Sequence, residues 1–503
     1  MSSSPLHVAF RVDASLAIGT GHFMRCLTLA DALAKRGAPA RFICRQVPAA
    51  LRELAARRGH EVVLLPTGSS KASGDLPHSA WLGCSQPDDV RDTLDALGSG
   101  KLDWLVVDHY ALDSRWETKL RKAARRILAI DDLADRKHDC DLLLDQNLYA
   151  AAHARYTGKL PPHCCSLIGP RYALLREEFA RLHDEAVPRS GRVRRLLISF
   201  GGVDADNLTA MAIEAVAAVG GQQADVVIGA QHPRRAAIEA RCRDLGFTCH
   251  VQTERMAEVM AAADLAIGSG SSSTWERCAV GLPTVTFAVA ENQRRLVEDA
   301  AREGLVYAPG TADSDALTAH LHALFDNAGL RQALSHNGLQ MVDGRGVKRV
   351  LRAMGVREVT VREATLKDSA KVFRWRNHPT IRAVSRDTAP IPRAHHEKWF
   401  ARVIGDREGG LLIGEYRGSE IGVVRFDVHD GAAEVSIYLA PGAGAEGSGP
   451  ELLLAAESWL ARSRRKVGAI RATVLRDNER SRGLFEVCGY RLAATTHEKV
   501  PSQ

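Results

Sequence analysis

A histidine, an aspartate and two glycines stand close together in the segment RVDASLAIGTGHFMRC at 11–26. The apolar run before Asp13 predicts a strand, and Gly19 with Gly21 predicts the turn that follows it. His22 then falls in the first turn of a predicted helix. Since the positive end of the helix dipole disfavours an imidazolium there, a neutral His22 could take a proton as a general base. The alternative is that His22 only caps the helix or packs against it.

A second loop that could do chemistry is IGSGSSSTWERCAVGLP at 267–283, between an apolar run and a helical pattern. Its backbone N–H groups and hydroxyls could hold a pyrophosphate. These groups belong to Gly270, Ser271, Ser272 and Thr274. One carboxylate farther along, Glu276, could accept both hydroxyls of a ribose. The alternative is a solvated serine-rich loop with a surface glutamate, because serine and threonine also cap ordinary helices.

Polar residues follow several other apolar runs. Gly201 and Gly202 in FGGVD follow one run, and Asn292 and Gln293 in ENQ follow another. The others are Asp108, His109, Tyr110, Asp131, Asp132, Asp145, Gln146 and Asn147. Because the carboxyl ends of parallel strands meet at one edge of a sheet, we expect these residues to face one cleft. For Asp132 the favoured alternative is a helix N-cap.

The spacing of the apolar runs predicts the elements that position these residues. From 7 to 145, short apolar runs alternate with helical patterns, which is typical of a doubly wound parallel sheet. After a polar linker at 184–194 the alternation resumes, and helical patterns at 314–354 close the unit. We expect an α/β protein with two Rossmann-like lobes in a GT-B-like arrangement, followed by a β-rich α+β domain. The expected domains are 1–185, 194–350 and 357–503.

Composition excludes several classes of protein. With 503 residues, 45% of them hydrophobic and 25% charged, the chain has the make-up of a globular protein of several domains. Its net charge of +7 suits a phosphorylated small ligand but is too small to predict nucleic-acid binding. The cysteines form no CxxC pair and the histidines no HExxH pattern, so we expect no metal site. No apolar run is long enough for a membrane helix and the start has no leader pattern, so we expect a cytoplasmic protein without membrane insertion.

Residues 6–340 carry motifs that resemble the UDP-sugar hydrolases of pseudaminic acid biosynthesis. The motifs are IGTGHFMRC (18–26), VVDHYALD (106–113), IDDLADRKHDCDLLLDQN (130–147), GPRYALLREEF (169–179), SFGGVDADN (199–207), SGSSSTWERCAVGLP (269–283) and ENQ (291–293). The resemblance implies a GT-B-like enzyme that hydrolyses UDP-2,4-diacetamido-2,4,6-trideoxy-β-L-altropyranose to UDP and the free sugar without a metal. Two-lobed UDP-sugar glycosyltransferases share this frame and the Glu276 signature, so transfer to an acceptor is the alternative function.

The same resemblance assigns roles to residues. His22 corresponds to the family's proposed base, which would activate a water for attack on the anomeric carbon with inversion. Tyr110 and Asn292 would line the sugar site, and the 270–276 loop with Glu276 would hold UDP. The full set expected to bind the UDP-linked sugar is Asp13, Gly21, Tyr110, Gly201, Gly202, Gly270, Ser271, Ser272, Thr274, Glu276, Asn292 and Gln293.

Residues 357–503 resemble the sugar-amine branch of the GNAT acetyltransferases. The motifs are FRWRNHPTIR (373–382), HHEKWF (395–400), EVSIYLAP (434–441), GSGPELLL (447–454) and LRDNERSRGLFEVCGYR (475–491). The resemblance implies acetyl-CoA as co-substrate, with contacts from Leu439, Gly447, Gly449, Asn478 and Ser481. Two positions depart from the family pattern, because Gly444 replaces an Arg or Gln and Phe485 replaces the usual Tyr of the last helix.

Together these resemblances imply a bifunctional enzyme. The C-terminal domain would acetylate the 4-amino group of a UDP-amino sugar, and the first two domains would then release UDP from the product. In the alternative, the C-terminal domain is degenerate and only binds CoA.

Overall fold

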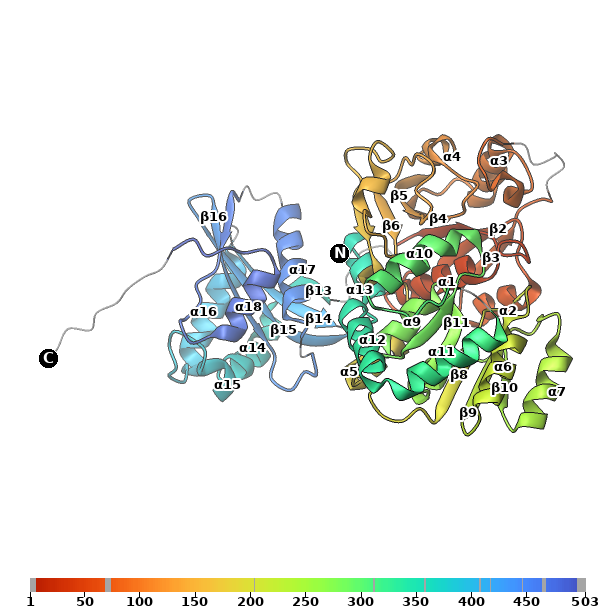
Figure 1. The fold of residues 1–503 in the computed structure, drawn as a ribbon. Coiled ribbons are helices and arrows are strands. Elements are labelled where there is room, and N and C mark those ends of the chain that lie inside the picture. Colours follow the sequence, from red (N-terminus) through yellow and green to blue (C-terminus); the bar gives the residue numbers. More distant parts are fainter. Residues whose placement is uncertain are drawn as a thin grey trace. The chain divides into compact units, whose positions relative to one another are not determined.

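The computed structural model describes residues 6–67, 74–202, 204–310, 313–356, 359–406, 409–416, 418–445, 447–463 and 467–494. The chain divides into two compact units, Met1–Gly355 and Val356–Gln503. Unit 1 holds two parallel sheets and unit 2 holds a third, mostly antiparallel sheet (Figure 1). These sheets confirm the predicted fold class of two Rossmann-like lobes followed by an α+β domain.

The first lobe is built on seven parallel strands in the order β3-β2-β1-β4-β5-β6-β7. They are β1 (Val8–Val12), β2 (Ala40–Cys44), β3 (Glu61–Leu64), β4 (Leu102–Asp108), β5 (Ala124–Ile130), β6 (Leu142–Asp145) and β7 (Cys165–Ile168). The sequence pattern predicts the first six but not β7, in which Leu167 alone is buried. The strand order reverses between β1 and β4, so their carboxyl ends frame a crevice of the kind in which such sheets bind ligands.

Helices and short 3-10 turns connect these strands. They are α1 (Gly21–Ala34), α2 (Ala49–Arg57), η1 (Ser79–Leu82), α3 (Gln86–Leu97), α4 (Ser114–Leu120), η2 (His153–Tyr156), η3 (Pro170–Tyr172) and α5 (Glu177–Glu185). The first of them, α1, buries Phe23, Cys26, Leu27, Ala30 and Leu33, whose spacing of three and four residues forms one apolar face. This face holds α1 against the sheet, and His22 therefore sits at the carboxyl end of β1.

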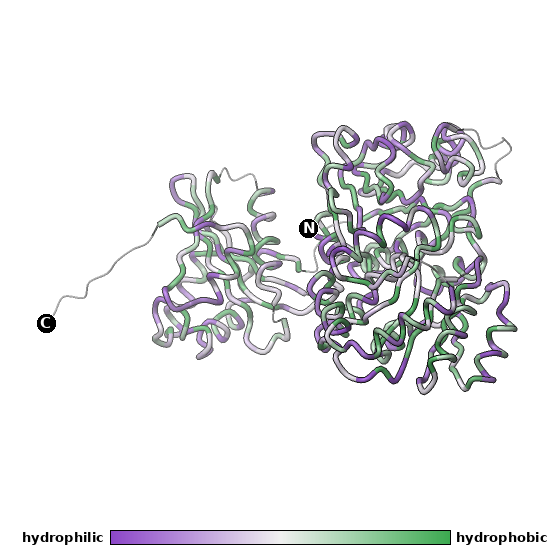
Figure 2. The backbone as a smooth tube through the Cα atoms, in the orientation of Figure 1, coloured by the Kyte–Doolittle hydropathy of each residue, from purple (hydrophilic) through white to green (hydrophobic). Residues whose placement is uncertain are grey.

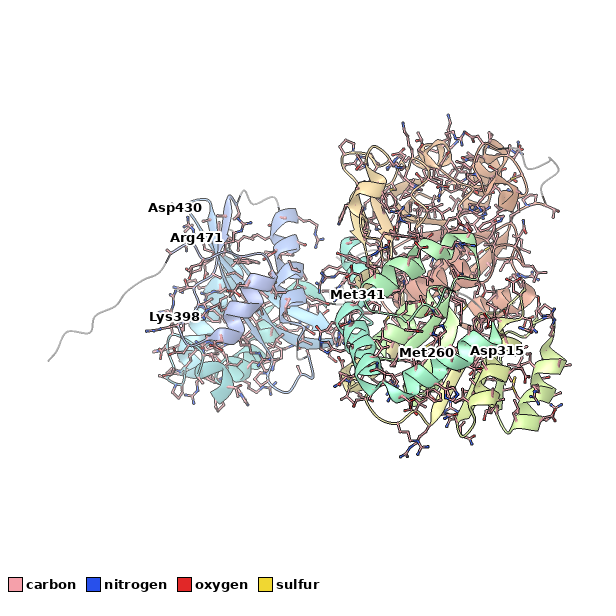
Figure 3. All side chains as sticks on the ribbon, in the orientation of Figure 1. Met260, Asp315, Met341, Lys398, Asp430 and Arg471 are labelled. Carbon is pink, nitrogen blue, oxygen red and sulfur yellow. The ribbon has the colours of Figure 1, made fainter. Side chains whose placement is uncertain are left out.

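The second lobe has five parallel strands in the order β10-β9-β8-β11-β12. The strands are β8 (Arg195–Ser199), β9 (Gln223–Ile228), β10 (Thr248–Val251), β11 (Leu265–Ser269) and β12 (Thr284–Phe287), as predicted. The helices are α6 (Leu208–Val219), α7 (Arg235–Leu245), α8 (Met256–Ala262), α9 (Ser273–Ala279), α10 (Glu291–Arg302), α11 (Ser314–Asp326) and α12 (Ala328–Met341). Hydrophobic stretches along these strands can be followed in Figure 2. Met260 of α8, labelled in Figure 3, belongs to the core between the sheet and its helices.

Packing crosses the predicted boundary between the lobes in both directions. The α5 helix packs on α8 and α9 of the second lobe, whereas α13 (Gly346–Ala353) packs on α1 and η3 of the first. The approach of α13 requires glycine at its start, because a Cβ on Gly346 would lie 2.1 Å from the carbonyl oxygen of Ala173. A helical pattern does not reveal which lobe a helix covers, and the limits 1–185 and 194–350 stay a prediction.

Unit 2 is a five-stranded sheet in the order β13-β14-β15-β16-β17 with helices around it. Its elements are β13 (Val359–Glu363), η4 (Leu366–Asp368), α14 (Ser369–Arg376), α15 (Pro379–Arg382), α16 (Arg393–Gly405), β14 (Gly410–Tyr416), β15 (Ser419–His429), β16 (Ala432–Leu439), α17 (Gly449–Arg462), β17 (Ala469–Arg471) and α18 (Glu479–Val487). Four strands pair antiparallel, and β17 pairs parallel with β16.

Candidate active sites

A cleft in unit 1 brings together residues from both lobes. Its walls are Ile18, Gly21, His22, Arg25, Tyr110, Asp132, Leu133, Gln146, Asn147, Tyr149, Gly270, Ser271, Ser272, Gln293 and Leu296. Seven of them are among the residues predicted to act on a UDP-sugar, namely Gly21, His22, Tyr110, Gly270, Ser271, Ser272 and Gln293. Residues more than 240 positions apart in the chain, such as Gly21 and Gly270, therefore share one cavity.

His22 is held by a carboxylate from the neighbouring strand. Its Nδ1 lies 2.6 Å from Oδ1 of Asp108, which ends β4. A carboxylate can only accept a hydrogen bond, so the proton of a neutral ring stands on Nδ1 and the lone pair on Nε2. The His22 side chain is 11% exposed and that of Asp108 is fully buried. This arrangement has the two parts of an oriented general base, a ring and a group that fixes its tautomer.

Asp108 also binds the guanidinium of Arg25, one helical turn after His22. Nε of Arg25 donates to Oδ2 at 2.6 Å, and one Nη donates to Oδ1 at 2.7 Å. Burial by itself would raise the pKa of Asp108, but the charge of Arg25 outweighs it and holds that pKa well below its usual range. Asp108 is therefore a carboxylate at neutral pH and keeps its bond to His22.

Tyr110 and Asp132 form the neighbouring wall. The Tyr110 hydroxyl donates to Asp132, and the Tyr110 ring meets the His22 ring edge-on with centroids 4.7 Å apart. Burial and the nearby carboxylate raise the pKa of Tyr110 well above its usual value, so the phenol stays protonated. The N-cap interpretation of Asp132 is wrong, because no helix follows it and its carboxylate also accepts from Arg25 and Asn147.

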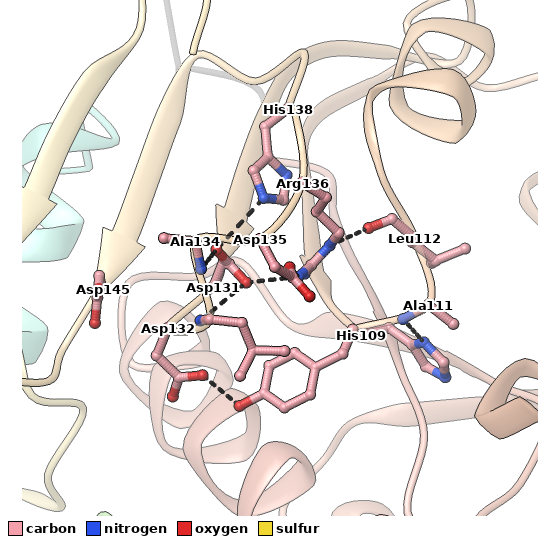
Figure 4. A network of polar contacts seen from close by, with 12 residues as sticks. His109, Ala111, Leu112, Asp131, Asp132, Ala134, Asp135, Arg136, His138 and Asp145 are labelled. Atoms are coloured by element: carbon pink, nitrogen blue, oxygen red, sulfur yellow. Dashed lines mark hydrogen bonds and ion pairs between the residues drawn. The ribbon is translucent and has the colours of Figure 1, made fainter. Parts of the chain in front are cut away.

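Behind this wall a buried network holds the loop after β5 (Figure 4). Asp131 pairs with Arg136 at 2.8 Å, and one of its oxygens lies 3.6 Å from His138. Burial would lower the pKa of His138, but Glu117 at 2.8 Å and Asp131 raise it to about 10. Asp131 therefore stabilises the loop after β5 through its ion pair with Arg136 and does not line the cleft.

In the second lobe the predicted nucleotide loop runs from β11 into α9. Ser271 and Ser272 line the cleft, and the Ser271 hydroxyl lies 2.9 Å from that of Ser273. Thr274 is buried and accepts a hydrogen bond from Arg277, so it faces away from the cleft. Glu276 is not among the residues that line the cleft, and 23% of its side chain is exposed. Burial raises the pKa of its carboxyl, although Arg176 at 3.9 Å acts to lower it.

Other predicted substrate contacts stand apart from the cleft lining. Asp13 is fully buried, where it pairs with Arg11 at 2.8 Å and faces His109 at 3.2 Å. Gly201 and Gly202 follow β8 and are exposed, outside the set that lines the cleft. For Asn292, whose side chain lies outside the described part of the structure, the predicted role stays a prediction.

Unit 2 places its predicted CoA contacts around the end of β16. Leu439 ends that strand, and β17 pairs with β16 only from Ala432 to Glu434, so the two strands separate before Leu439. Gly444 has a φ of +62°, a conformation that arginine or glutamine would rarely adopt, which explains this departure from the family pattern.

The two helices beside β16 give some of these residues a structural role. Gly447 precedes α17, and a Cβ on Gly449 would lie 2.6 Å from Leu484 of α18, so Gly449 permits close helix packing. Asn478 caps α18 by accepting from the backbone N–H of Ser481 at 3.0 Å. These roles leave the predicted contacts with CoA untested.

Phe485 of α18 packs against Tyr490, which follows the helix. The Phe485 ring contacts Tyr490, whose hydroxyl donates to Glu457 at 2.8 Å. Burial and this bond raise the pKa of Tyr490 well above its usual value.

Sequence reasoning missed Arg25 and Tyr149 among the cleft residues. Arg25 stands three residues after His22, a helical spacing that places both side chains on one face, and this was the available signal. Among the residues that the structure describes, no group of three or more His, Cys, Asp or Glu side chains could hold a metal ion. Nor does that part of the chain contain a helix with the length and apolar character needed to cross a membrane.

Comparison with known proteins relates each unit to a different group. Residues 358–491 match the family model described as acetyltransferase (GNAT) domain. The N-terminal part is 29% identical over 205 residues to the UDP-2,4-diacetamido-2,4,6-trideoxy-beta-L-altropyranose hydrolase of Campylobacter jejuni, which covers 41% of this chain and 63% of that protein. The spore coat polysaccharide biosynthesis protein SpsG of Bacillus subtilis is 26% identical over 193 residues, or 36% of this chain and 56% of its own.

Two further similarities cover more of the chain. Protein MJ1062 of Methanocaldococcus jannaschii is 20% identical over 414 residues, which is 78% of either chain. The structure of Phytolacca americana UGT2, complexed with UDP-2-fluoro-glucose and pterostilbene, superposes with a TM-score of 0.50 at 12% identity, over 71% of this chain and all of that one. The chain therefore combines a region similar to a UDP-sugar hydrolase, on a GT-B-like fold, with a C-terminal GNAT domain.

Proposed function

We propose that unit 1 hydrolyses a UDP-sugar to UDP and the free sugar, with His22 as the general base. The observation that carries the proposal is the His22–Asp108 pair in the same cleft as the 270–272 loop of the other lobe. The similarity to the Campylobacter hydrolase supports UDP-2,4-diacetamido-2,4,6-trideoxy-β-L-altropyranose as the substrate.

In the proposed reaction, Nε2 of His22 takes a proton from a water molecule while the water oxygen bonds to the anomeric carbon. The bond from that carbon to the β-phosphate oxygen breaks, and its electron pair leaves with UDP. Attack from the side opposite UDP inverts the anomeric centre. Asp108 stabilises the imidazolium that forms, in the way a triad carboxylate does. The hydroxyls of Ser271 and Ser272, which line the cleft, would stabilise the charge on the departing diphosphate.

Isotope labelling tests this reaction. In ¹⁸O water, cleavage between the sugar carbon and oxygen leaves UDP without label, whereas attack on phosphorus puts the label into UDP. We expect unlabelled UDP, an unchanged rate in EDTA, and no turnover by His22→Ala with UDP binding retained. Near-normal turnover by His22→Ala would remove the histidine from the mechanism.

A glycosyltransferase is the second candidate, because the GT-B-like fold of unit 1 is shared with UGT2. The two functions differ in what the reaction needs. UDP release in water alone supports hydrolysis, and UDP release that depends on an added acceptor supports transfer.

For unit 2 we propose acetylation of a UDP-linked 4-amino sugar by acetyl-CoA, one step before the hydrolysis. The GNAT match and the separation of β16 from β17 support it. The amine nitrogen would form an amide with the acetyl carbon as the thioester C–S bond breaks, and CoA would leave as the thiol with the amine proton. A proton NMR time course with UDP-2-acetamido-4-amino-2,4,6-trideoxy-β-L-altropyranose, with and without acetyl-CoA, tests both steps. Hydrolysis of the acetylated substrate without any acetylation would leave unit 2 a domain that only binds CoA.

A further inference from the structure

Asn147 connects the two lobes through its side-chain amide. It follows β6 in the first lobe, and its Oδ1 accepts a hydrogen bond from Nε1 of Trp275 in α9 of the second lobe at 3.0 Å. Its Nδ2 donates to Oδ2 of Asp132, also at 3.0 Å. The side chain therefore joins a fully buried indole of one lobe to the wall of the cleft in the other.

The chemistry of an amide suits this position. The indole of Trp275 can only donate, and the carboxylate of Asp132 can only accept, so the bridging group must accept on one side and donate on the other. This requirement also determines which way the amide of Asn147 points. A carboxylate or an apolar side chain of the same size would leave at least one buried partner without a bond.

The bridge continues to the general base. Nη1 of Arg25 lies 3.3 Å from the Asp132 oxygen that binds Asn147, and the same guanidinium binds Asp108. Asp108 in turn holds Nδ1 of His22. Trp275 is fully buried, and Asn147, Asp132 and Arg25 are mostly buried where they line the cleft, so the loss of one bond leaves a donor or an acceptor that the protein does not satisfy.

The other end of the bridge lies next to the 270–272 loop. Trp275 stands three residues after Ser272, in the helix that this loop enters, so a displacement of the loop also displaces the indole. We propose that Asn147 is a positioning residue that couples the 270–272 loop to His22, so that the base is aligned only while the lobes are joined through Trp275. The inference rests on the proposed hydrolase function and assigns a role that function does not require.

Two substitutions break the bridge at different places. Asn147→Leu removes both bonds of the amide with little change of volume, and Trp275→Phe removes the indole donor while keeping an aromatic ring. Trp104→Phe is the matched control, because Nε1 of the buried Trp104 donates at 3.0 Å to the carbonyl of Met354 and does not line the cleft. Trp275→Phe and Trp104→Phe each lose one indole N–H donor in a buried core, and they differ in whether the lost bond belongs to the bridge.

The experiment measures kcat and KM for release of UDP, and calorimetry measures the dissociation constant of UDP. We expect Asn147→Leu and Trp275→Phe each to lower kcat by about 10- to 100-fold, with KM and UDP affinity within about threefold of the parent. The double variant should lose no more than Asn147→Leu alone, since both changes break one link. Trp104→Phe should lower the urea midpoint and leave kcat unchanged.

Normal kcat in Asn147→Leu or Trp275→Phe, or a loss that appears in KM and UDP affinity instead, would overturn the inference. If circular dichroism shows that Asn147→Leu does not fold, Trp275→Phe decides the matter alone. A parent enzyme that binds UDP but releases none from the UDP-sugar would instead refute the proposed function, and the coupling with it. An active parent with insensitive variants refutes only the coupling.

Discussion

The carboxylate of Asp108 should matter to catalysis more than its buried position suggests, and Asp108→Asn tests this. The side chain accepts from His22 at 2.6 Å and from Arg25 at 2.6 and 2.7 Å. An asparagine keeps one oxygen and replaces the other with an NH₂ group. Nε of Arg25 and Sγ of Cys26 both donate to Oδ2, so an oxygen at that position keeps both bonds. The NH₂ group then stands at the Oδ1 position, where it faces Nδ1 of His22 and one Nη of Arg25.

This orientation reverses the tautomer of His22. With an N–H donor in front of it, Nδ1 must accept, and the ring proton moves to Nε2, where the lone pair of the base is needed. A general base forced into the wrong tautomer costs about 10³- to 10⁴-fold in kcat, or about 4 to 5.5 kcal/mol. Arg25 also loses its buried counter-charge, and only Asp132 at 3.3 Å remains, so we expect a loss of about 3 kcal/mol in the free energy of unfolding.

UDP release quantified by anion-exchange chromatography gives kcat, and urea unfolding gives stability. The matched control is Asp343→Asn, because Asp343 accepts from Arg349 at 2.7 Å and from the backbone of Arg345 at 3.0 Å, away from the cleft. The control should lose stability and keep kcat. A folded Asp108→Asn enzyme with kcat within about tenfold of the parent would refute the role given to the carboxylate.

Three further predictions concern stability and pH. Gly346→Ala should lower the free energy of unfolding of unit 1 in urea by about 1–3 kcal/mol, because the new Cβ would collide with the backbone of Tyr172 and Ala173. Gly100→Ala is the control, because open space surrounds Gly100. Equal urea midpoints for the two variants would contradict the packing of α13. The pKa of His138 is about 10 in the folded protein, above an unfolded value near 6.5, so the charged ring should stabilise the protein fully below about pH 6.5 and lose that effect as the pH rises to about 10. The difference in urea stability between the parent and His138→Gln should therefore shrink over this range. A difference that stays constant with pH would exclude the charged ring. Asn478→Ala should lower the stability of unit 2 by about 1 kcal/mol through loss of its bond to Ser481, as followed by thermal unfolding, and an unchanged melting temperature would show that the cap is dispensable.

Much of the fold follows from local sequence signals. Short apolar runs predict eleven of the twelve strands that the structure describes in unit 1, and the turn at Gly21 predicts the start of α1. The same rule brings His22 and Ser271 to one cleft, because parallel strands present their carboxyl ends at one edge.

What the sequence could not show is which polar residues bind one another. Asp108 and His22 are 86 positions apart, and Trp275 and Asn147 are 128 apart, with no local pattern that links them. For Asp13, which follows β1, the sequence predicts a place at the cleft. The structure shows its carboxylate fully buried and paired with Arg11 at 2.8 Å, which no local pattern indicates, and its predicted contact with the substrate stays a prediction.

The exchange of α5 and α13 between the lobes has a consequence for synthesis of the chain. The strands of the first lobe are synthesised early, whereas α13 (Gly346–Ala353), which packs on α1 and η3, is synthesised only after the second lobe. Until then the surface that α13 covers stays open to water. A ribosome stalled in the second lobe would therefore present a first lobe without this helix to chaperones and proteases.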